Sequence, residues 1–296
     1  MQYNKPPLTI QDQVLLLQRR GLNIPDSQKA EDVLKTLGYY RLSAYFIPFY
    51  NPGQDRHEFL TNVCFDDVIK LYHYDRRLRL LFAEALGRIE IAIRATTCDS
   101  LCLMTSDPFW FQGLGNFKFD FDHADFLKKL KVQLAFSKET FAAHFPKKYS
   151  NEYPPSWAVF QAIDFGTCST IVQNLRKRQL NSIGKHYLLD NSTFKSWVYC
   201  LRVLRNHVAH HSRIWNRIFS GKLKHAGDVP STLMETLDKP NFEILKGYAC
   251  VIEYFLRHID TNSDWWIRYV KLTNEFHLRA KHDVIKRKIE HFNLSD

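Results

Sequence analysis

The sequence predicts an all-α protein, and three observations support this fold class. Apolar residues recur three and four positions apart over most of the chain, which is the period of a helix with one buried face. Glycine and proline number only 11 each in 296 residues, too few for the many tight turns of a β-sandwich or barrel. Hydrophobic residues make up 45% of the chain, enough to bury a sizeable core.

Capping signals predict the first helices. Thr9 precedes an apolar run as an N-cap residue, and Gly21 is a suitable stop for that helix. Two more helices are expected from Asp26 or Ser27 to Leu37 and from Tyr39 to Ile47, followed by a turn at 51–55. A very long helix, or two nearly collinear ones, is then expected from Asp66 to about Met104, because its apolar period is interrupted only by Gly87.

The rest of the chain is predicted to alternate between helices and loops. A loop covers 107–122, and further breaks fall at the prolines between 146 and 155 and at 221–239. The basic segment 282–292 is compatible with a helix or with a frayed end. The expected helices cover 122–145, 157–163, 167–178, 192–219, 242–258 and 264–276.

The charge of the chain indicates a polyanionic partner. Its 41 basic and 31 acidic residues give a formal net charge of +10, spread over short clusters. Each cluster by itself is more typical of a solvated helix face, so only their sum favours RNA or another polyanion. The clusters are Arg76-Arg77-x-Arg79, Lys128-Lys129-x-Lys131, Lys147-Lys148, Arg176-Lys177-Arg178 and Lys286-Arg287-Lys288.

Signals for export, membrane insertion and metal binding are missing from the sequence. The polar N-terminal residues lack an apolar signal region, and no apolar run approaches 18 residues. The six cysteines show no metal-binding spacing, so we expect buried free thiols in a cytoplasmic protein. His207 and His211 are four residues apart, but no carboxylate nearby in sequence completes a site, and we therefore expect no metal and no cofactor.

The segment Leu201–Arg217 has the pattern with the most chemical content. If it is one continuous helix with Arg205 at zero on a helical wheel, a polar arc covers roughly 60° to 140° and an apolar arc roughly 260° to 320°. The polar arc contains Arg202, Arg213, Asn206, Arg217 and His210, and the apolar arc contains Leu201, Leu204, Val208 and Trp215. The segment thus predicts one buried face and one cationic face.

Arg205, Asn206 and His210 are the residue types that RNA cleavage without a metal requires. Histidine exchanges a proton near neutral pH, and the arginine fork binds a phosphate and stabilises charge on the phosphorane. Asn206 would orient the scissile group or hold the histidine in one tautomer, and the 2′-hydroxyl of the RNA would be the nucleophile. The alternative is a solvated basic helix face, because an Arg-x4-His spacing also arises there by chance.

Short motifs follow one another in order from residue 3 to residue 217. They are Tyr3-Asn4-Lys5-Pro6-Pro7-Leu8-Thr9, Arg20-Gly21-Leu22, Gly38-Tyr39-Tyr40-Arg41-Leu42-Ser43-Ala44-Tyr45, Leu86-Gly87-Arg88-Ile89-Glu90-Ile91-Ala92-Ile93-Arg94, Asp164-Phe165-Gly166-Thr167, and Arg205-Asn206-x-x-Ala209-His210 with the residues up to Arg217. Together they resemble the AbiD/AbiF abortive-infection family of the HEPN superfamily. Beyond about residue 225 no motif resembles the family.

The resemblance implies a bacterial ribonuclease of phage defence with an HEPN-like helical bundle. Its composite active site would be formed by the Arg-x4-6-His helices of two HEPN units, so this chain, with one such motif, would act as a homodimer. We expect an N-terminal helical subdomain at 1–60, an HEPN-like core carrying the motif at 61–260, and a basic C-terminal helical extension at 261–296.

The resemblance also implies roles for residues outside the catalytic motif. The long helix would pack beside the motif helix, so that Glu90, with Arg94 next to it, would orient Arg205 or His210. The simpler explanation for Glu90 and Arg94 is intrahelical pairing. The residues expected to bind RNA are Arg202, Arg213, Arg217 and His211.

Three functions follow from the sequence. The first is a metal-independent endoribonuclease that also binds a structured small noncoding RNA, as the AbiF branch implies; that RNA would hold the nuclease inactive until infection. The second is a catalytically silent RNA-binding HEPN protein. The third is a toxin component of a toxin–antitoxin pair, held by a protein antitoxin that neutralises its basic face.

Overall fold

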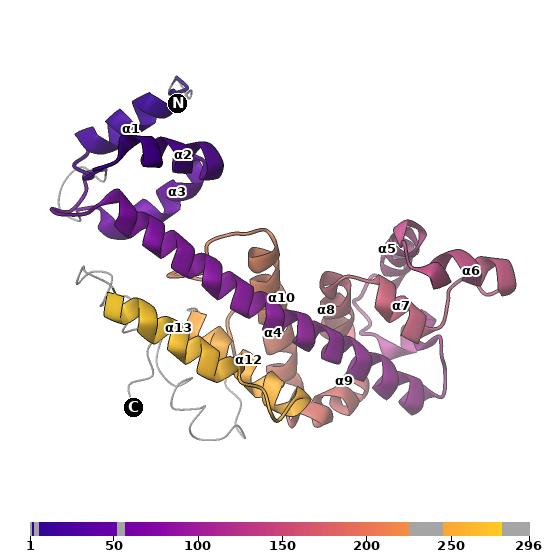
Figure 1. Cartoon of the computed structure of the whole chain (residues 1–296). Coiled ribbons are helices and arrows are strands. Elements are labelled where there is room, and N and C mark those ends of the chain that lie inside the picture. Colours follow the sequence, from indigo (N-terminus) through magenta and orange to yellow (C-terminus); the bar gives the residue numbers. More distant parts are fainter. Residues whose placement is uncertain (1, 3–5, 52–56, 225–244, 280–296) are drawn as a thin grey trace. The chain divides into compact units, whose positions relative to one another are not determined.

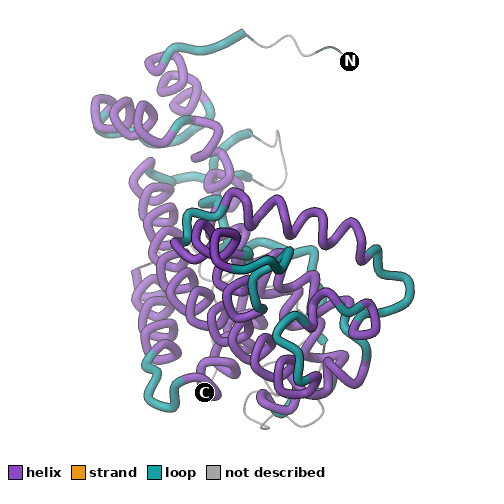
Figure 2. The backbone as a smooth tube through the Cα atoms, turned by 90° about the vertical axis from the view of Figure 1, so that its right-hand side faces the viewer, coloured by secondary structure: helices purple, strands orange, loops and turns teal. Residues whose placement is uncertain are grey.

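The computed structural model describes residues 2, 6–51, 57–224 and 245–279, and these residues form an all-α protein (Figure 1). Figure 2 shows helices and connecting loops throughout this part of the chain. Its only β-type pairings are isolated bridges such as that between Phe117 and Leu175. The predicted fold class is therefore confirmed.

The first elements begin and end where the capping signals predict. The hydroxyl of Thr9 accepts from the backbone N–H of Asp12 at 3.1 Å, and Gly21 adopts a φ of +88° after the helix. The turn expected at 51–55 lies, apart from Asn51, outside the described residues. These elements are α1 (Ile10–Arg19), α2 (Ser27–Leu37), α3 (Tyr39–Phe46), the 3-10 turn η1 (Ile47–Phe49) and α4 (Phe65–Thr105).

The predicted long helix forms as the single helix α4, with 41 residues. The helix continues through Gly87 without a break. An added Cβ at Gly87 would meet no neighbouring element within 4 Å, so close packing does not require glycine there. Between α4 and the next helix, the segment expected to be a loop contains two short 3-10 turns, η2 (Trp110–Gln112) and η3 (Leu114–Asn116).

Residue contacts divide the chain into two compact units, and each unit includes part of α4. The first contains the described residues up to Leu80 together with Tyr269–Arg279. The second runs from Leu81 to Arg268 and contains the whole candidate site. The boundaries expected from the sequence, 1–60, 61–260 and 261–296, stay a prediction.

The first unit has a buried polar cluster in its core. Asp75 is fully buried and forms an ion pair with Arg79, one helical turn further along α4. The hydroxyl of Tyr45 on α3 donates to the carboxylate of Asp75 at 2.6 Å and accepts from Arg79 at 3.1 Å. Tyr45 and Phe46 are both buried, so these aromatic side chains of α3 belong to the core of the unit.

The second unit contains shorter helices, and two of the predicted helices are each split into two. The helix expected at 122–145 ends at Phe136, because Ser137 becomes extended and its hydroxyl accepts from the N–H of Glu139. The helix expected at 167–178 ends at Asn174, because Leu175 and Arg176 pair with the 116–118 segment. The resulting helices are α5 (His123–Phe136), α6 (Thr140–Lys148), α7 (Ser156–Ala162), α8 (Phe165–Asn174) and α9 (Lys177–Gly184).

The remaining helices begin close to their predicted positions, although α10 ends earlier than predicted. The 3-10 turn η4 (Lys185–Tyr187) leads to α10 (Asn191–Ala209), and α12 (Leu245–Ile259) and α13 (Trp265–Arg279) follow. The basic segment 282–292 lies outside the described residues. Within the described chain, every helix is too short or too polar to cross a membrane.

Candidate functional site

The helix that carries the Arg-x4-His motif is α10, at the centre of the second unit. Its N-terminus is capped by Asp190, whose carboxylate accepts from the backbone N–H groups of Ser192 and Thr193 at 2.8 and 3.1 Å. One face of α10 packs against α8, α9 and α12. Leu201, Leu204 and Val208 are buried on that face, as the helical wheel predicts.

The C-terminal end of α10 corrects the prediction of a helix continuing to Phe219. Ala209 is its last residue, and His211 adopts a left-handed φ of +55°. The N–H of Ser212 donates to the carbonyl of His207, and the N–H of His211 donates to that of Val208. This is the Schellman pattern that ends many helices, formed here around a histidine in place of glycine.

The early end of α10 means that two arginines do not lie on the predicted cationic face. Arg213 and Arg217 follow the helix, so their wheel positions beside Asn206 were wrong. The burial of Ile214 and Trp215 anchors this post-helical segment to the core. Of the polar arc, only Arg202 and Asn206 remain on the helix, together with Arg205 at its edge, while His210 forms the C-cap.

A buried carboxylate on α4 connects the two helices of the site. Glu90 is only 8% exposed and forms an ion pair with Arg94, one turn along α4. Its other oxygen accepts from the Nε of Arg205 on α10 at 3.2 Å. Both the intrahelical pair and the expected contact with Arg205 are thus present, and a single carboxylate is shared by two guanidinium groups.

The remaining motif residues surround the end of α10 and differ in exposure. His210 and His211 are exposed, whereas Asn206 is half-buried. The guanidinium of Arg202 lies 4.8 Å from the ring centre of Tyr199, a cation–π contact on the same helix. The exposed imidazole of His210 is therefore accessible to a large substrate near the end of the helix.

His207 differs from its two neighbouring histidines because it is partly buried. Its ring lies 5.6 Å from that of Phe219, and burial lowers the pKa of His207, as do the nearby side chains of Arg217 and His210. Among the described residues, His, Cys, Asp and Glu side chains form no group of three or more suited to a metal ion. The neighbours of His207 include the aromatic ring of Phe219 and the guanidinium of Arg217.

Several basic residues that the sequence analysis assigned to polyanion-binding clusters are paired within the protein. The clusters at 76–79 and 128–131 each contribute two such residues. The pairs are Arg77–Glu275, Arg79–Asp75, Lys129–Asp125 and Lys131–Glu152. Their charges are partly neutralised, and the cluster at 286–288 lies outside the described residues. The basic clusters are thus a weaker indication of RNA binding than their number suggests.

A second polar cluster lies at the other end of α10, and sequence reasoning missed it. Four lysines from separate parts of the sequence line a cavity beside the first turns of this helix. They are Lys118, Lys177, Lys195 and Lys224, of which only Lys177 belongs to a basic cluster.

Comparison with known proteins identifies the family of the chain. No match is found among curated proteins or among solved structures. A family model described as Abi-like protein matches residues 32–216, which is more than half of the chain and includes α4 and α10 with Glu90, Arg205 and His210. The chain therefore belongs to the family of Abi-like proteins.

Proposed function

We propose that this Abi-like protein is a metal-independent endoribonuclease that also binds a structured small noncoding RNA. Membership of the family supports a role in abortive infection of phage-infected bacteria. The site at the end of α10 supports the chemistry, because a fixed cation and an accessible imidazole occur together there. The resemblance to HEPN proteins supports RNA as the substrate.

In the proposed reaction, His210 acts as the general acid/base at the RNA backbone. It removes the proton of a 2′-hydroxyl, whose oxygen attacks the adjacent phosphorus while the bond to the 5′-oxygen breaks and that oxygen takes up a proton from water. Arg205 binds the scissile phosphate and stabilises its developing charge, and Asn206 orients the substrate or the imidazole. The products are a 2′,3′-cyclic phosphate and a 5′-hydroxyl.

The observation that carries this proposal is the buried carboxylate of Glu90 behind Arg205. Bound through its Nε, Arg205 is held in one orientation while its terminal nitrogens stay available to a phosphate. Arg94 on the same carboxylate supports this arrangement. Such a preorganised cation is what phosphate stabilisation needs, and a purely solvated helix face would not require a buried partner.

RNA contacts outside the catalytic group are assigned to Arg202, Arg213, Arg217 and His211. Arg202 lies one turn before Asn206, and the other three follow the end of α10. Since Arg213 and Arg217 no longer share the helical face, we infer that they contact RNA from the post-helical segment. Because the sequence contains one Arg-Asn-x-x-x-His motif, at Arg205–His210, we further propose that the active form is a homodimer with a composite site.

The proposal is tested by incubating the purified protein with RNA in the presence of a chelator. Bound RNA is first removed, and cleavage is compared before and after its removal to test whether that RNA inhibits the enzyme. Cleavage is expected without divalent metal, and it should be lost in His210→Ala. The matched control is His186→Ala, which removes an exposed histidine of η4 in the same unit.

Each outcome distinguishes the nuclease from the alternatives. A strict requirement for Mg²⁺, or full activity of His210→Ala, contradicts the proposed mechanism. RNA that copurifies and is never cleaved supports a catalytically silent RNA-binding protein. Copurification of an acidic protein without RNA supports a toxin component held by an antitoxin.

A further inference from the structure

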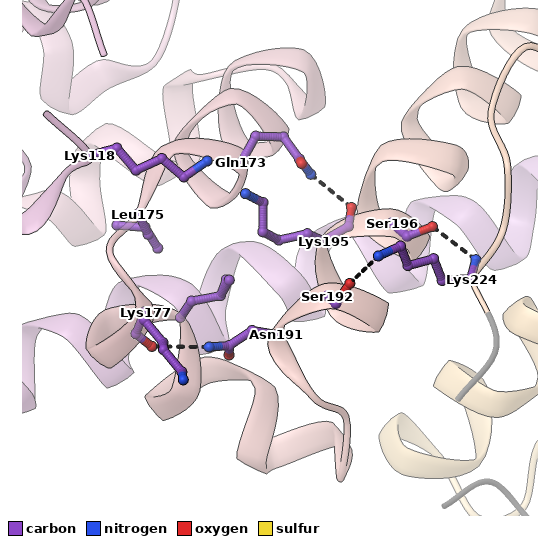
Figure 3. A pocket seen from close by; sticks show the side chains of 10 residues that line it. Lys118, Gln173, Leu175, Lys177, Asn191, Ser192, Lys195, Ser196 and Lys224 are labelled. Atoms are coloured by element: carbon purple, nitrogen blue, oxygen red, sulfur yellow. Dashed lines mark hydrogen bonds between the residues drawn. The ribbon is translucent and has the colours of Figure 1, made fainter. Parts of the chain in front are cut away.

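The first two turns of α10 line a cavity of about 530 Å³, within the second unit (Figure 3). Its walls come from the loop after η3, from α8 and α9, and from the segment that ends at Lys224. The lining combines four lysines with amides, hydroxyl groups and two leucines. These residues are Lys118, Gln173, Leu175, Lys177, Leu180, Asn191, Ser192, Lys195, Ser196 and Lys224.

Hydrogen bonds among the lining residues fix the wall of this cavity. Gln173 donates to the carbonyl of Lys195 at 2.8 Å, and Asn191 donates to that of Lys177 at 3.2 Å (Figure 3). The ammonium group of Lys224 donates to the hydroxyl of Ser192 at 2.5 Å. The cavity wall is therefore organised by hydrogen bonds that fix its backbone, while the lysine side chains extend from it.

The lysines outweigh the carboxylates near them. Asp190 attracts Lys224, but its oxygens are occupied by the N-terminal cap of α10. Asp120 attracts Lys195 more weakly than Lys118 repels it. Among the described residues, the cavity thus collects positive charge without a carboxylate in its lining.

Lys118 lies close enough to Lys195 to disfavour the positive charge of Lys195. Figure 3 shows their side chains reaching toward the same space. Burial lowers the pKa of Lys195 to about 8, with the neighbouring Lys118 as a further cause and Asp120 opposing it. An anion placed between the two ammonium groups would remove this repulsion.

We propose that this cavity binds the phosphate group of a nucleotide, either free or within RNA. Lysine ammonium groups bind phosphate as mobile point charges, and Leu175 and Leu180 offer an apolar surface to the sugar or base. The volume lies in the range of small-molecule sites, roughly 300 to 1,000 Å³.

Along α10, Lys195 lies ten residues before Arg205, about 15 Å away along the helix axis. The inference therefore does not depend on RNA cleavage at the other end of the helix.

The test measures binding by isothermal titration calorimetry of the full chain. The probes are adenosine monophosphate, a short RNA with a 5′-phosphate and the same RNA with a 5′-hydroxyl. Lys118→Gln/Lys195→Gln is expected to weaken binding of the recognised probe by about tenfold or more, the effect of losing one or two charge-assisted hydrogen bonds. Lys177→Gln/Lys224→Gln serves as a second variant if the first does not fold.

The control, Lys138→Gln/Lys185→Gln, removes the same formal charge from exposed positions that lie outside the cavity and outside the basic clusters. Binding by the control but not by the cavity variants supports the site, and the preferred probe identifies the source of the phosphate. Equal binding by native protein and cavity variants, or no binding of any probe, overturns the proposal. Because none of these substitutions touches Arg205 or His210, failure of the nuclease proposal and failure of this one are distinguishable.

Proton uptake on binding gives a second, independent readout. Because the pKa of Lys195 is lowered to about 8, part of its population is neutral at pH 8, and a phosphate beside it should restore its charge, so that a fraction of a proton is taken up per nucleotide bound. The phosphate of the probe is already fully ionised at this pH, since its second pKa is about 6. Uptake is measured by titration in buffers of different ionisation enthalpy. It should disappear in Lys195→Gln, and binding without proton uptake by the native protein contradicts the proposed geometry.

Discussion

Replacing Glu90 by glutamine should weaken both the stability of the second unit and the proposed active site. The change removes one negative charge with almost no change in volume. Arg94 and Arg205 then share no carboxylate, and the side chains of these arginines are only 18% and 36% exposed. Two positive charges are left close together without the anion that separated them.

The expected loss follows from the burial of the three groups. Breaking a fully buried ion pair costs about 3–5 kcal/mol, whereas an exposed pair contributes about 0–1 kcal/mol. Glu90 is buried but Arg205 is partly exposed, so solvent screens part of the interaction. We therefore expect Glu90→Gln to lower the free energy of unfolding by about 2 kcal/mol, which shifts Tm by about 4–8 °C for a unit of this size.

A double-mutant cycle assigns this loss to the predicted partner. Unfolding in urea is followed for native protein, Glu90→Gln, Arg205→Gln and the double variant, and a coupling energy of about 1 kcal/mol or more is expected. The control is Glu84→Gln, which replaces another carboxylate of α4 and breaks its exposed ion pair with Arg268 on α13. This change should lower the free energy of unfolding by less than about 1 kcal/mol. A coupling energy near zero, or equal losses for Glu84→Gln and Glu90→Gln, would refute the role given to Glu90.

Two further predictions concern stability. Tyr45→Phe removes the hydroxyl that donates to buried Asp75, so the free energy of unfolding in urea should fall by about 1.5–3 kcal/mol; a change below about 0.5 kcal/mol would contradict this account. Because the pKa of His207 is lowered in the folded protein, the unfolded chain binds a proton first on acidification. The contribution of His207 to the free energy of unfolding is therefore fully present above pH 6.5 and is lost as the pH falls below that value. Melting curves between pH 5 and 7.5 should therefore be less pH-dependent in His207→Gln, and identical pH profiles would exclude this effect.

Most helix starts could be predicted because their signals are local. Thr9 and Asp26 accept from backbone N–H groups three residues later, and these caps are visible in the sequence as a polar residue before an apolar period. The long helix α4 was predictable for the same reason, since its apolar residues keep one period across Gly87.

The ends of helices were harder to predict because competing interactions decide them. At the end of α10, His211 adopts the left-handed conformation that usually indicates glycine, so the sequence contains no stop signal. After α8, the chain leaves the helix because Arg176 pairs with Asn116, about sixty residues earlier in the sequence. A local pattern cannot contain such a partner.

The candidate site was predictable in its motif and not in its surroundings. Arg205 and His210 were recognisable from their spacing, and Glu90 only through the family resemblance, because it lies 115 residues before Arg205. The lysine cavity had no sequence signal, since Lys118, Lys195 and Lys224 are separated in the chain and converge only through folding.

The chemical nature of the RNA ends is the most direct test of the proposed ribonuclease. After cleavage in the presence of a chelator, the fragments are analysed by mass spectrometry and by labelling of their 5′ ends with polynucleotide kinase. Attack by the 2′-hydroxyl predicts a 2′,3′-cyclic phosphate on one fragment and a 5′-hydroxyl on the other, with neither product formed by Arg205→Ala or His210→Ala. Fragments carrying a 3′-hydroxyl and a 5′-phosphate would show attack by water from the opposite side of the bond and would contradict the proposed mechanism.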